Sequence, residues 1–310
     1  MYLLNGACKD YLWGGTLLRD RFGKGEELSV VAESWELSTH NDGLTLLPDG
    51  TSLRAYLKNN PAAGGKSVVD GDLPMLVKLI DARKPLSVQV HPDDAYAARV
   101  GQRGKTELWH VLEAAEEACL YLGVAQDLTR EELERRIAEN TVEEVLKKVS
   151  VTAGESYFIP AGTLHAIGAG CLIYEVQQSS NLTYRVYDYG RVGADGKPRQ
   201  LHIEDALAVS TLTFVDTTPP GRNEADGTIV CCPYFTLREV AVEGEKDWAA
   251  PEDSFCHLLC VEGEIAAVQE ERVLPLAAGS GLFLAVGERV LLRGKGRLLA
   301  VSAGSESLKN

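Results

Sequence analysis

The sequence predicts a mainly β protein that is built from many short strands and divided into two domains. Short apolar or alternating runs, bounded by glycine, proline and aspartate, extend from Ser67 to His91 and from Leu108 to Gln178. This pattern is typical of a β-sandwich or barrel. The 310 residues, of which 45% are hydrophobic and 25% charged, are enough for two domains rather than one large core.

Two short helices are expected to interrupt the strands between residues 127 and 149. The segments TREELERRIAEN and TVEEVLKKV each begin with a threonine that is followed three residues later by a glutamate. This spacing is the capping-box pattern that begins a helix. Nearer the N-terminus, residues 25–38 fit a strand and residues 52–60 fit a short helix.

A break in composition suggests where one domain ends. The segment DTTPPGRNEADG, residues 216–227, is rich in proline, glycine and polar residues and separates two β-patterned stretches. We therefore expect a first domain at 1–215, a linker at 216–227 and a second, smaller barrel at 228–310. Turns within that barrel are indicated by Glu262-Gly263, Gly279-Ser280-Gly281 and Gly294-Lys295-Gly296.

The two halves contain a faint internal repeat. AGESYFIPAGTLH (153–165) and AGSGLFLAVGERV (278–290) share four of thirteen residues at an offset of 125. A generic β-hairpin would explain the same match. If the copies are related, His165 has become Val290, so only the first domain retains a site and the second is structural and free of metal.

Charge and cysteine content limit the possible partners. The formal net charge of -14 argues against nucleic acid or an anionic membrane, because both need a basic face. No basic segment followed by an apolar core begins the chain, and no stretch approaches a membrane span; a soluble cytoplasmic protein is expected. The seven cysteines form no CxxC pair, so we expect reduced, mostly buried thiols. Cys256 and Cys260 lack a second pair to complete a metal site and are expected in a core.

Polar side chains occupy one face of a strand that is otherwise apolar. In LSVQVHPDD, Ser87, Gln89 and His91 alternate with Val88 and Val90, so the polar and apolar residues point to opposite faces. A solvated edge strand is the alternative, since a proline and two aspartates follow as a turn.

Two further segments complete a set of metal ligands. GKTELWHVL places Lys105 and Glu107 on one strand face, and YFIPAGTLHAIGAG supplies His165 after a Pro-Ala-Gly turn. Alone, that histidine would fit a core or turn position. Together with His91 and Glu107 it forms a His, Glu, His set, which suits a catalytic zinc with an open position. Gln89 could add a neutral oxygen, and we expect one Zn²⁺ per chain.

A buried acid follows the last of these segments. In CLIYEVQQSSNLTYRVYDYGR, Glu175 is enclosed by apolar residues, where an unpaired carboxylate would be costly. A paired or functional acid is therefore favoured over surface charge. The remaining histidines have no comparable partners in the sequence and are expected to be structural: His40, His110, His202 and His257.

Taken in order, these segments resemble the type I mannose-6-phosphate isomerase family, and within it the short bacterial branch. The resemblance covers most of residues 1–200 and is carried by YLWGG (11–15), ESWELSTH (33–40), Gln89-Val90-His91-Pro92, Lys105-Thr106-Glu107, Pro160-Ala161-Gly162 with His165, and the spacing from Glu175 to Arg185. The C-terminal region matches only in pattern. The resemblance implies a pair of cupin (jelly-roll) domains with helical insertions and a zinc ion bound by Gln89, His91, Glu107 and His165.

The same resemblance implies two groups of substrate-binding residues. The phosphate would be bound by Ser87, Lys78 and Arg191, and the reacting carbons would be surrounded by Lys105, Glu175 and Arg185. The chain departs from many relatives at Asn181, where they have an aspartate four residues before the active-site arginine. A neutral amide cannot act as a carboxylate base.

The implied reaction interconverts mannose 6-phosphate and fructose 6-phosphate through an enediol intermediate. A Lewis acid would stabilise the developing oxyanion, and a carboxylate such as Glu175 would move a proton between C2 and C1. A dianionic substrate needs local positive charge in this acidic chain, and arginine can bind phosphate through its planar fork.

Three other functions compete with this interpretation. A non-catalytic sugar-phosphate-binding cupin regulator would keep the site but not the turnover. An iron-dependent cupin oxygenase would be expected to carry HxH where this chain carries QxH. A structural or storage β-protein would not need converging polar groups. A monomer or a homodimer fits the sequence equally well.

Overall fold

The computed structural model describes residues 1–192, 196–216 and 221–304. The chain forms two compact units: unit 1 comprises residues 1–9, 16–79 and 220–310, and unit 2 comprises residues 10–15 and 80–219. Residues 16–79, expected in the first domain, therefore group with the C-terminal residues by their contacts. The expected linker at 216–227 includes residues 217–220, which lie outside the described residues, so that division stays a prediction.

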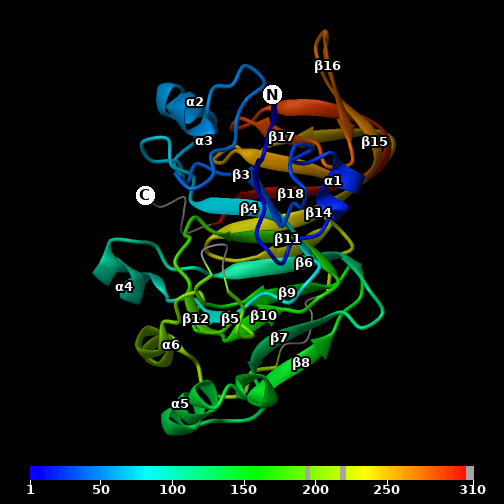
Figure 1. Ribbon diagram of the computed structural model, residues 1–310. Coiled ribbons are helices and arrows are strands. Elements are labelled where there is room, and N and C mark those ends of the chain that lie inside the picture. Colours follow the sequence, from blue (N-terminus) through cyan, green and yellow to red (C-terminus); the bar gives the residue numbers. More distant parts are fainter. Residues whose placement is uncertain (193–195, 217–220, 305–310) are drawn as a thin grey trace. The chain divides into compact units, whose positions relative to one another are not determined.

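Unit 1 contains a large antiparallel sheet. Its strands, in the order β1-β17-β15-β18-β14-β13 with β16 paired to β15, are β1 (Tyr2–Leu4), β13 (Thr228–Cys231), β14 (Phe235–Ala249), β15 (Cys256–Gln269), β16 (Arg272–Ala277), β17 (Gly281–Leu284) and β18 (Arg289–Ala303). Figure 1 shows the long strands β14, β15 and β18 in yellow to red. Inward-facing residues such as Val240, Leu258, Leu282 and Leu298 form its core. The alternating C-terminal sequence therefore forms strands, as expected, in a sheet that β1 from the N-terminus also joins.

The predictions of two of the three turns in this region are wrong. Gly263 lies inside β15 and Gly294 inside β18, and the two strands pair across these positions. A Cβ on Gly263 would lie 2.2 Å from the carbonyl oxygen of Lys295, and one on Gly294 would lie 2.3 Å from that of Glu264. These glycines permit close approach of two backbones rather than a turn. The Gly279-Ser280-Gly281 turn is confirmed, because β17 begins at Gly281.

The N-terminal part of unit 1 agrees with the local expectations. It contains β2 (Ala7–Lys9), α1 (Leu17–Phe22), β3 (Glu33–Leu37), α2 (Leu53–Asn59) and α3 (Pro61–Gly64), and β4 (Met75–Ala82) begins there. The strand within 25–38 and the helix within 52–60 are confirmed. The Ser52 hydroxyl begins α2 by accepting a hydrogen bond from the Ala55 backbone N–H.

Unit 2 contains two groups of strands and the remaining helices. The strands β5 (Val88–Val90), β7 (Cys119–Val124), β8 (Leu146–Ser150), β10 (His165–Ile167) and β12 (Tyr184–Tyr187) form a sheet in the order β12-β5-β10-β7-β8. The other group, in the order β11-β6-β9, contains β6 (Glu107–Ala114), β9 (Ser156–Ile159) and β11 (Cys171–Gln178). The helices are α4 (Asp94–Ala97), α5 (Arg130–Ala138) and α6 (Ile203–Val209).

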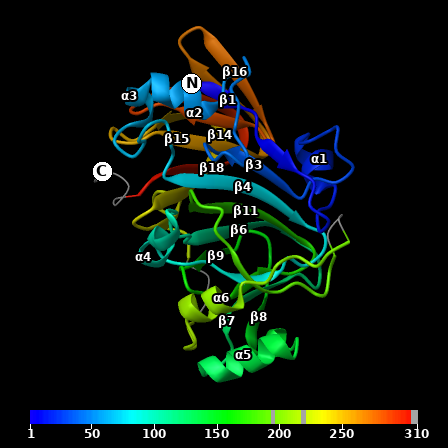
Figure 2. The same ribbon diagram turned by 60° about the vertical axis from the view of Figure 1, so that its left-hand side comes forward.

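Helices α5 and α6 cover one face of the five-stranded sheet. Val88 and Val90 of β5 share a buried core cluster with Leu133 of α5 and Ala206 of α6. Figures 1 and 2 both show the two helices beside this sheet. Because side chains alternate along a strand, the residues of β5 next to these valines face away from the helices.

Only one of the two expected inserted helices forms. Thr129 begins α5, and its hydroxyl accepts a hydrogen bond from the Glu132 backbone N–H at 3.1 Å. Thr141 makes no such bond; Val142–Val145 form one short 3₁₀ turn and the following residues form β8. The prediction of a second helix was wrong because β8 pairs with β7, and this pairing overrides the local helical preference.

The two threonines provide a matched stability test. Replacing Thr129 with alanine removes the helix cap, so we expect the free energy of unfolding to fall by about 1 kcal/mol. Thr141→Ala, which removes no cap hydrogen bond, should change it by less than about 0.5 kcal/mol. Urea unfolding of both variants measures the difference, and equal losses would contradict the assignment of α5 as the capped helix.

The described residues include no helix that is both long and apolar enough to cross a membrane. The seven cysteines are all free thiols, and four of them are buried, including Cys256 and Cys260 in the core of unit 1. Their expected role as core residues is thereby confirmed.

Candidate metal centre and active site

The polar face expected on β5 is present. Val88 and Val90 face the helices, whereas Ser87 and His91, on the opposite parity, are buried and Gln89 is half-buried. The alternative of a solvated edge strand is therefore wrong for Ser87 and His91. The Nδ1 atom of His91 lies 2.8 Å from the carbonyl oxygen of Leu182, and this bond fixes the ring so that Nε2 points towards Lys105 and Glu107.

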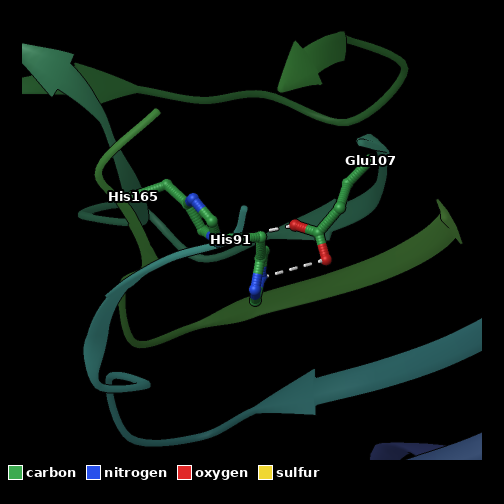
Figure 3. A group of neighbouring side chains, drawn as sticks. All are labelled: His91, Glu107 and His165. Carbon is green, nitrogen blue, oxygen red and sulfur yellow. Dashed lines mark ion pairs between the residues drawn. The ribbon is translucent and has the colours of Figure 1, made fainter. Parts of the chain in front are cut away.

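Glu107 and His165 meet His91 in the interior of unit 2. The Nε2 atoms of His91 and His165 each lie 3.4 Å from one oxygen of the Glu107 carboxylate. Figure 3 shows both imidazole rings directed towards this carboxylate. The Nδ1 atom of His165 is held 2.8 Å from the Thr163 carbonyl, so this ring also presents Nε2. The three potential ligand atoms lie within 4.8 Å of one another.

The chemistry of these donors fits a divalent cation. Burial lowers the pKa of His91 to about 3 and also lowers that of His165, so both rings are neutral. Burial alone would raise the pKa of Glu107, but the charge of Lys105 and the interactions with His91 and His165 together outweigh it and hold that pKa well below its usual value. Within the described residues, His165 Nε2 and Glu107 Oε2 are buried without a hydrogen-bond partner. Two neutral imidazoles and one carboxylate are typical ligands of catalytic zinc.

Lys105 belongs to the same group of side chains. Its buried ammonium forms an ion pair with Glu107 Oε1 and lies 3.1 Å from His91 Nε2. The ammonium can donate to that nitrogen because Nε2 carries no proton when Nδ1 donates to a backbone carbonyl. The negative charge of Glu107 is therefore matched by a positive charge inside the site.

Gln89 occupies a central place on this sheet. In the strand pairing it lies opposite His165 on one side and opposite Arg185 on the other. Its Oε1 atom is 3.5 Å from the hydroxyl of Ser87. It thus faces the same interior as the two histidines, and its part as a ligand stays a prediction.

Glu175 is a paired acid, as its apolar surroundings in the sequence indicated. It lies opposite Trp109 in the pairing of β11 with β6, and the indole N–H of Trp109 donates to Glu175 Oε2 at 2.8 Å. The same indole ring packs edge-on against His165, with 5.3 Å between ring centroids. Trp109 was missed in the sequence, although its position two residues after Glu107 places it on the same strand face.

Arg185 and Ser87 meet beside this centre. The Arg185 Nε–H donates to the Ser87 hydroxyl at 3.0 Å, and Nη1 donates to the carbonyl of Gln200 at 3.2 Å. Burial lowers the pKa of Arg185, and the positive charge of Arg199 lowers it further. The structure therefore concentrates positive charge next to Ser87.

Arg191 is held by a carboxylate that the sequence analysis did not single out. Arg191 and Arg199 both form ion pairs with Asp188, and Arg191 Nη1 donates to the carbonyl of Pro85 at 2.6 Å. Asp188 is one of several acids in this part of the sequence, and nothing in its neighbours distinguishes it.

Two further residues singled out in the sequence have other surroundings in the described structure. Lys78 belongs to unit 1, where its ammonium is 3.7 Å from Glu33 and 5.0 Å from the centre of the Trp35 ring. Asn181 is exposed and lies just before β12. The phosphate-binding role expected for Lys78 stays a prediction.

Asp188 should make stability depend on pH. Burial raises its pKa, but hydrogen bonds from Arg199 and Arg191 outweigh burial and lower the pKa below its usual range. Such a carboxylate stabilises the folded state at pH values above its unfolded pKa of about 3.9. This stabilisation is lost as the pH falls through the lower pKa of the folded state. We expect Asp188→Asn to cost about 1.5–3 kcal/mol at neutral pH.

The measurement is urea unfolding of wild type and Asp188→Asn over a range of pH. The difference between them should shrink from about pH 5 to about pH 3, because the Asp188 carboxyl takes up its proton in the unfolded wild type before it does so in the folded protein. A difference that stays constant over this range would contradict the ionised arginine-bound state.

Strand pairing in unit 1 supports the internal repeat seen in the sequence. β17 begins and ends 125 residues after β9. In unit 2, β9 pairs with β6 so that Ile159 lies opposite Glu107; in unit 1, β17 pairs with β15 so that Leu284 lies opposite Cys256. Cys256 therefore corresponds to Glu107.

The other ligand positions can be matched in the same way. His165 lies opposite Gln89 in unit 2, and Val290, its counterpart in the repeat, lies opposite Trp248 in unit 1. Two residues further on, His91 corresponds to Ala250. The four counterparts pack in or against one hydrophobic core: Trp248, Ala250, Cys256 and Val290. Apolar packing thus replaces the donor set in the second copy, which supports the expectation that it is structural.

The fold and the site together define a class of protein: a two-domain β protein of the cupin type, in which one domain carries a buried His, Glu, His group that could hold a cation. Comparison with known proteins gives the family. Residues 1–118 match the family described as phosphomannose isomerase type I, catalytic domain, and residues 225–303 match mannose-6-phosphate isomerase, cupin domain.

Individual relatives agree over most of the chain. Mannose-6-phosphate isomerase ManA from Bacillus subtilis is 32% identical over 291 residues, covering 90% of this chain and 91% of the relative. Mannose-6-phosphate isomerase from Streptococcus mutans is 37% identical over 244 residues, covering 75% and 76%. A crystal structure of the mannose 6-phosphate isomerase from Bacillus subtilis superposes with a TM-score of 0.87 at 32% identity, covering 97% of this chain and 98% of that one. This chain belongs to the type I phosphomannose isomerase family, and the resemblance and fold expected from the sequence are confirmed.

Proposed function

We propose that this protein interconverts mannose 6-phosphate and fructose 6-phosphate, using one Zn²⁺ held by Gln89, His91, Glu107 and His165. The observation that carries the proposal is the buried group of His91, Glu107 and His165, in which two neutral imidazoles face one ionised carboxylate. Membership of the type I phosphomannose isomerase family supports mannose 6-phosphate as the substrate. The bound ion would supply Lewis-acid stabilisation of negative charge on the sugar oxygens.

Glu175 is the proposed acid and base of the reaction. It would take the proton from C2 of the open-chain aldose and return it to C1, while a second proton moves from the C2 hydroxyl to the oxygen on C1. One proton is removed and one returned at carbon, so the sugar is neither oxidised nor reduced overall. The Trp109 hydrogen bond at 2.8 Å fixes one oxygen of this carboxylate, and Lys105 and Arg185 would lie around the reacting carbons.

Positive charge near Ser87 supports phosphate binding. Ser87 and Arg191 are the proposed phosphate ligands in unit 2, with Lys78 as a third. The Arg185–Ser87 hydrogen bond and the Arg191–Asp188 ion pair hold these groups in place. In a chain with a net charge of -14, such a local group of arginines favours a small anionic ligand rather than an extended polyanion.

The setting of the reaction follows from its substrate. A charged sugar phosphate does not cross a bilayer unaided, because burying its charge in hydrocarbon is costly. We therefore place the protein in the cytoplasm, as a monomer or homodimer, with neither nucleic acid nor membrane as a partner.

A coupled assay tests the proposal against a non-catalytic regulator. Purified protein loaded with zinc is given mannose 6-phosphate, and fructose 6-phosphate is followed with a coupling enzyme; calorimetry measures binding in parallel. We expect turnover that saturates with substrate. Binding of the sugar phosphate without turnover would instead show that the protein is a non-catalytic, sugar-phosphate-binding regulator.

A further inference from the structure

The amide of Gln177 occupies the same interior as the metal centre. Gln177 is the cross-strand partner of Glu107 in the pairing of β11 with β6, and it lies two residues after Glu175. Because parity places residues two apart on one strand face, Gln177 shares the face of Glu175. The contacts of Glu107 and Trp109 with His165 show that this face points towards the metal ligands.

Two hydrogen bonds fix which end of this amide is free. The Nε2 atom of Gln177 donates to the carbonyl of Gln178 at 3.0 Å and to the carbonyl of Ser180 at 2.6 Å. Since both partners are carbonyl oxygens, the NH₂ group must occupy this position and the carbonyl must point the other way.

The free end is a buried acceptor. Gln177 is fully buried, and across the part of the chain that the structure describes its Oε1 atom has no hydrogen-bond partner. A buried amide oxygen without a partner is costly, and such atoms are uncommon in native proteins. An acceptor that is held in place at this cost, beside a binding site, indicates a donor supplied by a ligand.

The turn that holds Gln177 also holds a metal ligand. Ser180 accepts from the Gln177 amide through its carbonyl, and its hydroxyl accepts from the backbone N–H of Leu182. The carbonyl of Leu182 in turn binds His91 Nδ1. One short segment, residues 178–182, therefore orients both the Nε2 atom of His91 and the free oxygen of Gln177.

We propose that Gln177 is a specificity-determining residue whose Oε1 accepts a hydrogen bond from a hydroxyl group of the sugar phosphate. This inference rests on the proposed isomerase function and adds a residue to the substrate site. The recognised chemistry is a sugar hydroxyl close to the metal-bound end of the substrate. The phosphate group would be bound separately, by the arginines near Ser87.

The test compares wild type with Gln177→Met, which keeps the length of the side chain and removes both polar ends. Gln178→Met is the matched control, because Gln178 Oε1 accepts from the Thr106 N–H and its Nε2 donates to Asp94. Both variants lose hydrogen bonds of the fold, but only Gln177→Met removes the free acceptor. Bound zinc and thermal unfolding are measured for each.

The probes are mannose 6-phosphate, used as the substrate, and analogues that lack the hydroxyl at C2, C3, C4 or C5 in turn. Each analogue is tested as a competitor of mannose 6-phosphate. In wild type, one analogue should bind about five to ten times more weakly than the parent sugar, the effect of one neutral hydrogen bond. Gln177→Met should raise KM for mannose 6-phosphate by a similar factor with zinc content unchanged, and it should no longer discriminate against that analogue. Gln178→Met should keep the discrimination.

Three results would overturn the proposal. Equal binding of every analogue by the wild type would show that no hydroxyl uses the acceptor, and this result does not depend on whether Gln177→Met folds. Unchanged kinetics of Gln177→Met would do the same, and equal weakening with the parent and all analogues would show a purely structural role. Failure of the proposed function is distinct, because it would appear as zinc-loaded wild type that does not turn over mannose 6-phosphate.

Discussion

Replacing Glu107 with alanine should abolish metal binding, remove isomerase activity and strongly destabilise unit 2. The carboxylate is fully buried between the two histidines and forms an ion pair with the buried Lys105. Removing it leaves the lysine ammonium uncompensated in the interior, and losing one partner of a buried ion pair costs about 3–5 kcal/mol. Loss of the Lewis acid should lower kcat/KM by about a thousandfold or more.

A double variant separates the two effects. In Glu107→Ala/Lys105→Met no buried charge is left unpaired, so much of the lost unfolding free energy should return. Activity and zinc should not return, because a metal ligand is still missing. Urea unfolding of the two single variants and the double variant gives the interaction free energy between Glu107 and Lys105. Metal analysis of the same variants measures bound zinc. A double variant no more stable than Glu107→Ala would contradict the charge-pair account.

Replacing Glu175 with glutamine should remove turnover while the metal remains. The amide cannot take up or return a proton, and losing a positioned acid–base group lowers kcat by about 10²- to 10⁴-fold. Its oxygen can still accept the Trp109 N–H, which donates to Glu175 Oε2 in the structure, so the fold should be retained. Zinc content near the wild-type value together with lost kcat is the expected result, and retained turnover would remove Glu175 from the mechanism.

Trp109→Phe provides the matched comparison for this prediction. It keeps an aromatic ring beside His165 but removes the indole N–H that holds the Glu175 carboxylate. The carboxylate remains available as a base, so kcat should fall less than in Glu175→Gln. A larger loss of kcat in Trp109→Phe than in Glu175→Gln would indicate that the indole contributes more than positioning.

The sequence predicted the buried group of His91, Glu107 and His165 better than its surroundings, and the reason is alternation along a strand. Parity on one strand placed Gln89 and His91 opposite Val88 and Val90, and the structure keeps that division because the valines are buried under α5 and α6. Trp109 could have been found by the same rule.

Asp188 and the free acceptor of Gln177 could not be predicted from sequence. Each depends on how one loop or turn folds. Asp188 is shared by two arginines that follow it by 3 and 11 residues, and Gln177 is oriented by the carbonyls of residues 178 and 180. No spacing rule specifies such contacts.

The errors in the fold have similar physical causes. Leu146–Ser150 carries a helical pattern but forms β8, because its pairing with β7 outweighs local propensity. Gly263 and Gly294 were expected to mark turns, yet each lies within a long strand where two backbones approach too closely for a side chain. The grouping of residues 16–79 with residues 220–310 depends on long-range contacts that composition does not reveal.

The most direct test of the central claim is the turnover of mannose 6-phosphate by the wild-type protein before chelation, after chelation and after zinc is restored. The account predicts that fructose 6-phosphate formation stops when the metal is removed, returns with about one zinc per chain, and does not return in Glu107→Ala. Full turnover by protein that metal analysis shows to be free of bound ions would contradict it.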